Sequence, residues 1–159
     1  MKNLAITSAR VDGRRRQLLA AGAGLGLIVL TRPALAAPDT LAQAIAAFAG
    51  DRPVTVGRVV LEVATLVDNG NTVPISVTVD SPMTPASHVT AIAVFNERNP
   101  QRDVARFLLT QRSGRAHVST RIRLSTSQKL TAVARMNDGS YWSQTVDIIV
   151  TLAACIEGD

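Results

Sequence analysis

TVPISVTV, residues 72–79, decides the fold class, because its apolar and polar side chains alternate with a period of two. HVSTRIRL, residues 117–124, repeats the pattern. This alternation is typical of a β-strand with one buried face. We therefore expect both stretches to be half-buried strands.

Further strands are expected on either side of these two. Similar runs cover residues 58–63, 89–95, 104–109, 130–136 and 141–152. Turn-forming residues separate them, among them Asp68-Asn69-Gly70-Asn71, Asn99-Pro100 and Asn137-Asp138-Gly139. The last of these is typical of a hairpin. Seven short strands at this spacing predict an all-β fold, an immunoglobulin-like antiparallel β-sandwich over residues 54–152. A small β-barrel is the alternative.

One short amphipathic helix and a linker are expected before the sandwich, in residues 37–53. Leu41, Ile45 and Phe48 recur at helical spacing. Asp39 can cap the first turn, and Gly50 followed by Pro53 can end the helix.

Two apolar features are candidate interfaces with another protein. One is Ile149 together with Val133 on neighbouring strands, and the other is the apolar side of the helix. Both features also suit a protein core, so the pattern alone leaves the choice open.

Residues 1–36 have the layout of an export signal that is removed. They hold six of the basic residues against one acidic residue, then an apolar run, then Ala34-Leu35-Ala36 as a cleavage site. Arg15-Arg16-Gln17-Leu18-Leu19 fits the twin-arginine pattern. The apolar run of 13 residues is short of the roughly 20 needed to span a bilayer, which makes a retained anchor less favoured. An ordinary secretory signal remains the alternative route.

The rest of the chain, from Ala37, holds 11 basic and 11 acidic residues, so the high pI is a property of the signal. This balance and the small number of aromatic residues argue against a nucleic-acid partner. We expect no membrane partner either. The twin-arginine route carries folded proteins, so with no cofactor motif in the sequence we expect a protein partner during export to the periplasm.

Cys155 is the one chemically distinctive group, because a single cysteine cannot form an intramolecular disulfide. Its neighbours Ala153, Ala154, Ile156, Glu157 and Gly158 lie beyond the alternating pattern of the last strand. We expect that strand to hold the chain up to about Leu152 and residues 153–159 to form a mobile arm. Cys155 would then reach roughly 10 Å beyond the sheet.

No other constellation suggests catalysis or metal binding. His88 and His117 fall on different predicted strands without the spacing of a metal site. An enzyme that acts alone through Cys155 would need a base held rigidly against the thiol, and nothing in the sequence supplies one.

These features together resemble SoxY, the sulfur-carrying subunit of the periplasmic thiosulfate-oxidising Sox system. The resemblance rests on Asn71-Thr72-Val73-Pro74-Ile75, Val79-Asp80-Ser81-Pro82-Met83-Thr84, Phe95-Asn96-Glu97-Arg98-Asn99-Pro100, Ser119-Thr120-Arg121-Ile122-Arg123-Leu124 and the terminal cysteine.

The resemblance implies a covalent carrier and not an enzyme, with Cys155 as the site of sulfur attachment and no cofactor of its own. It also implies a heterodimer with a SoxZ-like immunoglobulin-fold subunit. The further partners it implies are a haem-containing enzyme that joins thiosulfate to the thiol, a hydrolase that releases sulfate, and a sulfane dehydrogenase.

The tail differs from the Gly-Gly-Cys-Gly usual in this family. Ala153, Ala154 and Ile156 restrict the backbone more than glycine does. Glu157, Asp159 and the terminal carboxylate put negative charge near the sulfur, which disfavours the thiolate. The alternative function is a non-catalytic exported binding or scaffold module, in which Cys155 is incidental or forms an intermolecular disulfide.

Overall fold

The computed structural model describes residues 40–50 and 52–154. The predicted signal of residues 1–36 lies outside them. Within the described residues the order of elements is α2 (Leu41–Ala49), β1 (Val54–Val56), β2 (Val59–Glu62), β3 (Leu66–Val67), β4 (Val73–Val79), β5 (Val89–Asn96), β6 (Asp103–Leu108), the 3-10 turn η2 (Gln111–Ser113), β7 (His117–Ile122), β8 (Gln128–Met136) and β9 (Tyr141–Val150).

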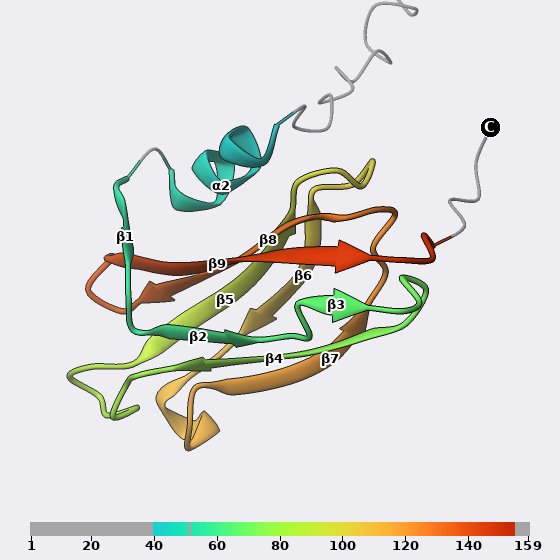
Figure 1. Cartoon of the computed structure of the whole chain (residues 1–159). Coiled ribbons are helices and arrows are strands. Elements are labelled where there is room, and N and C mark those ends of the chain that lie inside the picture. Colours follow the sequence, from blue (N-terminus) through green and yellow to red (C-terminus); the bar gives the residue numbers. More distant parts are fainter. Residues whose placement is uncertain (1–39, 51, 155–159) are drawn as a thin grey trace, which may run out of the picture. The chain divides into compact units, whose positions relative to one another are not determined.

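The strands form two sheets, which confirms the predicted sandwich (Figure 1). The large sheet has the order β1-β9-β8-β5-β6, with β3 also paired to β9, and the small sheet has the order β2-β4-β7. All seven predicted strands are present. β1 and β3 are additional; they have three and two residues and pair in parallel with β9, so they are too short to show any period.

The main core lies between the two sheets. In β4 the apolar residues of the alternating pattern, Val73, Ile75, Val77 and Val79, are all buried, and Ile122 and Leu124 meet them from β7 and the residues after it. Buried residues of β5, β8 and β9 complete this core from the large sheet. The period-two reading of residues 72–79 and 117–124 is therefore confirmed.

A second, smaller core lies on the outer face of the large sheet, beneath α2. Phe48 of the helix contacts the rings of both Phe95 and Tyr141, each at 5.8 Å between ring centroids, tilted against the first and edge-on to the second. Val133 belongs to this cluster and is completely buried, so of the two readings that the pattern left open for it, core and interface, the structure shows core. The apolar side of α2 is likewise part of the protein's own core. Ile149 remains exposed.

The ends of α2 follow from local hydrogen bonds. Thr40, and not the predicted Asp39, is the N-cap: its side chain accepts from the Gln43 amide while the Gln43 side chain accepts from the Thr40 amide. Gly50 ends the helix in the left-handed conformation, at φ 63°, as predicted from its position. None of the helices among the described residues is long and apolar enough to cross a membrane.

The predicted hairpin joins β8 to β9 at Asn137-Asp138-Gly139. Gly139 has φ 82°, a conformation that favours glycine. The hydroxyl and the amide of Ser140 both donate to the Asp138 carboxylate, and these bonds lower the pKa of Asp138. The turn thus sets the register of β8 and β9, and with it the position of the far end of β9.

Truncation of Ile122, which is 5% exposed, tests the strand register. Ile122→Ala is expected to lower the free energy of unfolding by about 2–4 kcal/mol, because it leaves a cavity between the sheets. Urea denaturation monitored by Trp142 fluorescence measures the change. Val56→Ala is the control, since Val56 is 81% exposed and its truncation is expected to cost less than about 0.5 kcal/mol. An equally small cost at Ile122 would contradict the register.

Candidate functional site at the C-terminal end of the sheet

Most of the predicted site residues lie outside the described part of the chain. These are Cys155, Ile156, Glu157 and Gly158 of the carrier arm and Arg15, Arg16, Leu18 and Leu19 of the signal motif. Ala153 and Ala154 are described. The geometry of the site is therefore the geometry of the chain that leads into Cys155.

The end of β9 is held on both of its edges. On one edge β3 runs parallel to it, with the Ile149 amide donating to Thr65 O at 2.8 Å and the Thr151 amide donating to Val67 O at 3.0 Å. On the other edge the Val150 amide donates to the Ser127 hydroxyl at 2.9 Å. The backbone at the end of β9 is therefore fixed by hydrogen bonds on both sides.

Beyond β9, three backbone hydrogen bonds connect three distant segments. The Gly70 amide donates to Leu152 O at 2.8 Å, the Leu124 amide donates to Gly70 O at 2.8 Å, and the Ala154 amide donates to Leu124 O at 3.1 Å. We call Gly70, Leu124, Leu152 and Ala154 the C-terminal clamp.

The clamp holds the backbone as far as Ala154. The structure assigns β9 to Tyr141–Val150, and the Leu152 side chain is 61% exposed, so the expectation that the strand pattern holds to Leu152 is wrong. The Ala154 side chain is only 8% exposed and its amide is bonded to Leu124, so the expected free chain at 153–154 is also wrong. The expected distance of roughly 10 Å between Cys155 and the sheet assumed three free residues after Leu152. Measured from the clamp, Cys155 is one residue away, a Cα–Cα step of about 3.8 Å.

Only glycine fits at position 70. A Cβ on Gly70 would lie 2.2 Å from Leu124 O, 3.0 Å from Ala154 N and 3.1 Å from a Val150 methyl group. Leu124 is fully buried and cannot move aside without disturbing the core. The sequence marks residues 68–71 as a turn but gives no sign of this close approach.

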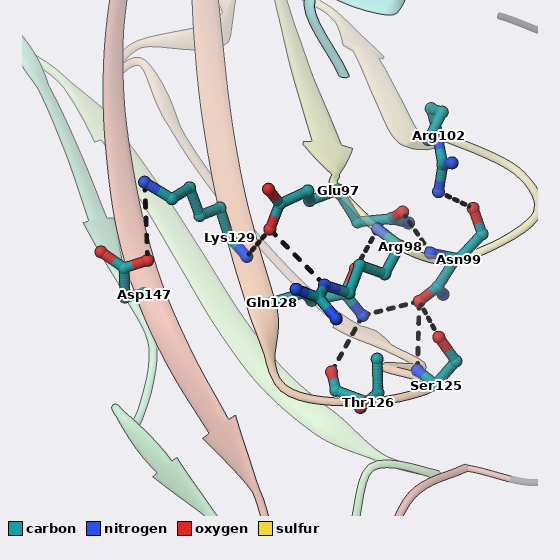
Figure 2. A network of polar contacts seen from close by, with 10 residues as sticks. Glu97, Arg98, Asn99, Arg102, Ser125, Thr126, Gln128, Lys129 and Asp147 are labelled. Atoms are coloured by element: carbon teal, nitrogen blue, oxygen red, sulfur yellow. Dashed lines mark hydrogen bonds and ion pairs between the residues drawn. The ribbon is translucent and has the colours of Figure 1, made fainter. Parts of the chain in front are cut away.

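The loop that carries Leu124 is fixed by Asn99 (Figure 2). Asn99 Oδ1 accepts from the Ser125 amide at 3.1 Å, the Ser125 hydroxyl at 2.9 Å and Gln128 Nε2 at 2.7 Å. Asn99 Nδ2 donates to Arg123 O at 2.9 Å. Both residues next to Leu124 are thus held by the side chain of Asn99.

Asn99 is itself positioned by buried polar groups of the same segment. Asn96 is completely buried; its Oδ1 accepts from the Asn99 amide at 3.0 Å and its Nδ2 donates to Gln101 O at 3.0 Å. The Arg98 amide donates to Gln128 Oε1 at 2.8 Å. The sequence predicts a turn at Asn99-Pro100 but does not indicate this supporting role of Asn99. Several asparagine and glutamine residues near the ends of β5 and β8 are the signal that could have indicated it.

The two histidines make local surface contacts and lie apart in the fold, His117 on β7 and His88 just before β5. His117 Nδ1 is 2.9 Å from the Thr78 hydroxyl and His117 Nε2 is 3.2 Å from the Ser119 hydroxyl, while His88 Nδ1 is 3.0 Å from Thr84 O. In the described residues no three His, Cys, Asp or Glu side chains gather in a way that could hold a metal ion.

Substitution at Gly70 tests the clamp. In Gly70→Ala the new methyl group must displace Leu124 O or Ala154 N, so hydrogen exchange of the Ala154 amide, measured by NMR, is expected to accelerate by about tenfold or more. Gly114→Ala is the matched control: it strains a backbone with φ 77° but meets no atom within 4 Å. Equal exchange of Ala154 in the two variants would contradict the clamp.

Comparison with known proteins agrees with the fold and with the motifs. The family model of the sulfur oxidation protein SoxY matches residues 45–155, whereas no curated protein sequence matches the chain. Among solved structures, the sulfur carrier protein SoxY from Chlorobium limicola f thiosulfatophilum is 26% identical with a TM-score of 0.61, covering 71% of this chain and 97% of its own.

Two less similar structures share the fold alone. The superoxide reductase (neelaredoxin) from Ignicoccus hospitalis is 17% identical with a TM-score of 0.54, covering 59% of this chain and 80% of its own. The superoxide reductase from Nanoarchaeum equitans is 13% identical with a TM-score of 0.52, covering 60% of this chain and all of its own. Because the SoxY model matches well over half of the chain, the protein belongs to the SoxY family of sulfur oxidation proteins.

Proposed function

We propose that the protein is a periplasmic sulfur carrier that binds thiosulfate-derived sulfur covalently on Cys155 and presents it to separate enzymes. The observation that carries this proposal is the extent of the family match, which ends at residue 155 and so includes the cysteine. The clamp supports it further, because it fixes the backbone immediately before that residue. As a SoxY protein the chain is a carrier and not a catalyst.

The proposed loading step is an oxidation. The thiol and thiosulfate join as Cys–S–S–SO3⁻, with loss of one proton and two electrons, and the electrons pass to the haem-containing partner enzyme. Water then cleaves the S–SO3⁻ bond in the hydrolase, which gives sulfate, two protons and the persulfide Cys–S–S⁻. A sulfane dehydrogenase would oxidise the remaining sulfur. The carrier itself supplies the thiolate, which is the nucleophilic form of cysteine.

The alanine in place of the family's usual glycine before the cysteine has a structural explanation in the clamp. The Ala154 side chain is 8% exposed, so its methyl group fills space that glycine would leave empty. Alanine also has fewer backbone conformations than glycine, which lowers the entropy lost when the clamp closes. We infer that this member of the family presents its cysteine from a more restrained tail.

We further propose that the protein forms a heterodimer with a SoxZ-like immunoglobulin-fold subunit and leaves the cytoplasm already folded. The support is the twin-arginine pattern at Arg15 and Arg16 in a chain whose sequence holds no cofactor motif. Such a signal on a cofactor-free protein is explained by export together with a partner.

Replacement of the thiol tests the carrier function. Cys155→Ser is expected to abolish every covalent sulfur adduct, because a hydroxyl at neutral pH does not replace a thiolate. Mass spectrometry of the C-terminal peptide, after incubation with thiosulfate and the haem enzyme, measures the adducts. The urea midpoint should match that of the wild type, since the clamp uses the backbone of Ala154 and not the thiol.

Two outcomes would contradict this proposal. Adducts that persist in Cys155→Ser would place the sulfur elsewhere. A bare thiol or a Cys155 disulfide dimer in the wild-type protein under sulfur-oxidising conditions would favour the scaffold module instead.

Export is tested separately with Arg15→Lys/Arg16→Lys. The double variant keeps the positive charge but removes the paired arginines, so periplasmic protein detected by immunoblot is expected to fall to background if the twin-arginine route is used. The single Arg14→Lys variant is the control. Normal export of the double variant would instead indicate the general secretory route.

A further inference from the structure

The charges of the chain are divided unevenly along its sequence. Residues 97–123 hold seven arginines but only two acidic residues, a net charge of +5. The other residues from Ala37 onward hold four basic and nine acidic ones, a net charge of −5. The overall neutrality therefore conceals a strongly basic segment, which runs from the loop after β5 through β6 and η2 to the residue after β7.

The fold places this segment along one open side of the sandwich. β6 is the last strand of the large sheet, β7 is the last strand of the small sheet, and η2 lies in the connection between them (Figure 1). The two edges are neighbours at one end, where Asn99 Nδ2 donates to Arg123 O and where Asp103 and Arg123 line the same hollow. On the opposite side of the sandwich, the Leu61 amide of β2 donates to Gln144 of β9.

Six of the seven arginines are exposed, and we call these six the arginine side: Arg98, Arg106, Arg112, Arg115, Arg121 and Arg123. Two of them have an acidic partner. Arg106 pairs with Asp103 at 2.5 Å, and Arg98 lies 3.9 Å from Glu97. Within residues 40–50 and 52–154, the other four form no ion pair. The described part of the chain thus leaves most of this positive charge without a counter-ion.

Protection of the open edges explains only part of the arginine side. Charged side chains on an edge strand prevent it from pairing with another chain, and Arg106 on β6 and Arg121 on β7 can serve this purpose. The other four arginines lie outside the strands, in the loop before β6, in η2, after η2 and after β7. Like charges gathered in this way repel one another and destabilise the folded state. Bound negative charge would offset that repulsion.

The arginine side is too long for a small anion and does not lie in one plane. β7 has six residues and spans about 20 Å, and Arg115 and Arg123 lie beyond its two ends. Arg106 lies on the outer face of the large sheet, against α2, whereas Arg121 alternates with buried Ile122 and lies on the outer face of the small sheet. A ligand that meets both faces must straddle the edge, which a flat membrane surface does not do.

Two other kinds of macromolecule fit the arginine side less well. Single-stranded nucleic acid is bound by aromatic side chains that stack on its bases, but the one aromatic residue in this segment, Phe107, packs against the main core. A second copy of this chain would have to supply the acidic surface. The described acidic residues outside the segment lie on separate strands and loops: Glu62, Asp68, Asp80, Asp138 and Asp147.

We propose that the arginine side is a docking surface for an acidic protein other than a second copy of this chain. The partner it fits places carboxylates on both sides of the edge formed by β6 and β7. There each carboxylate can accept two parallel hydrogen bonds from a guanidinium group. This inference is independent of Cys155 and of the proposed carrier function, and it adds a binding surface made only of residues that the structure describes.

The test removes two arginines that have no ion pair among the described residues. Arg115→Gln/Arg121→Gln lowers the charge of the arginine side by two. Arg52→Gln/Lys129→Gln is the matched control, since both side chains are exposed and lie outside residues 97–123. The probe is poly-L-glutamate, whose dissociation constant is measured by fluorescence anisotropy at low ionic strength, where exposed charges are least screened. A single-stranded oligonucleotide of equal charge and vesicles of phosphatidylglycerol are the comparison probes.

Arg115→Gln/Arg121→Gln is expected to bind poly-L-glutamate about fivefold or more weakly than the control variant, because it loses two exposed charge pairs with the probe. Its urea midpoint should match that of the wild type, since neither side chain is buried. Equal binding by the two variants would overturn the docking surface. Tighter binding of the oligonucleotide or the vesicles than of poly-L-glutamate would assign the surface to nucleic acid or membrane and also overturn the inference. Self-association of the wild type that is lost in Arg115→Gln/Arg121→Gln would overturn it in favour of a second copy. Each of these outcomes leaves the carrier function intact.

Discussion

Leu124 is the residue on which the rest of the structure converges. Its side chain is fully buried between the two sheets, its amide binds Gly70 and its carbonyl binds Ala154. Because its side chain is packed in the core, Leu124 cannot shift its backbone toward its hydrogen-bond partners. Gly70 and Ala154 must therefore take positions that suit Leu124. The missing Cβ at Gly70 and the network centred on Asn99 are the two features that allow this fit.

This arrangement connects the family's chemistry to its fold. The stability of the sandwich does not depend on a reactive group, and the chemistry of a thiol does not depend on the sandwich. The clamp joins the two by fixing the backbone of Ala154, the residue before Cys155. What the fold contributes next to the proposed site of sulfur attachment is therefore a fixed backbone.

The sequence was informative where one physical signal decides the structure. Val73 to Val79 and Ile122 follow period two, so their burial could be predicted from the pattern alone. The hairpin at Gly139 and the end of the helix at Gly50 likewise follow from backbone preferences of single residues.

The remaining features depend on which distant segments meet. Val133 alternates like an outward residue, and only the packing of α2 buries it. β3 is two residues long and exists because β9 is beside it. The same holds for the site: Cys155 stands out by composition, whereas the contact of Gly70 with Leu124 and Ala154 joins segments more than fifty residues apart in one case and eighty-four in the other.

The parallel pairing of β1 and β3 with β9 has a consequence for how the protein acquires its final form. Val54 pairs with Tyr141, and Val67 pairs with Val150, so β9 pairs with residues more than eighty positions earlier in the sequence. Contacts between such widely separated residues require the closure of long loops, and they form late in folding. A partly folded chain therefore lacks the clamp that fixes the backbone of Ala154. Only when both sheets are complete does this residue, which directly precedes Cys155, reach its final position.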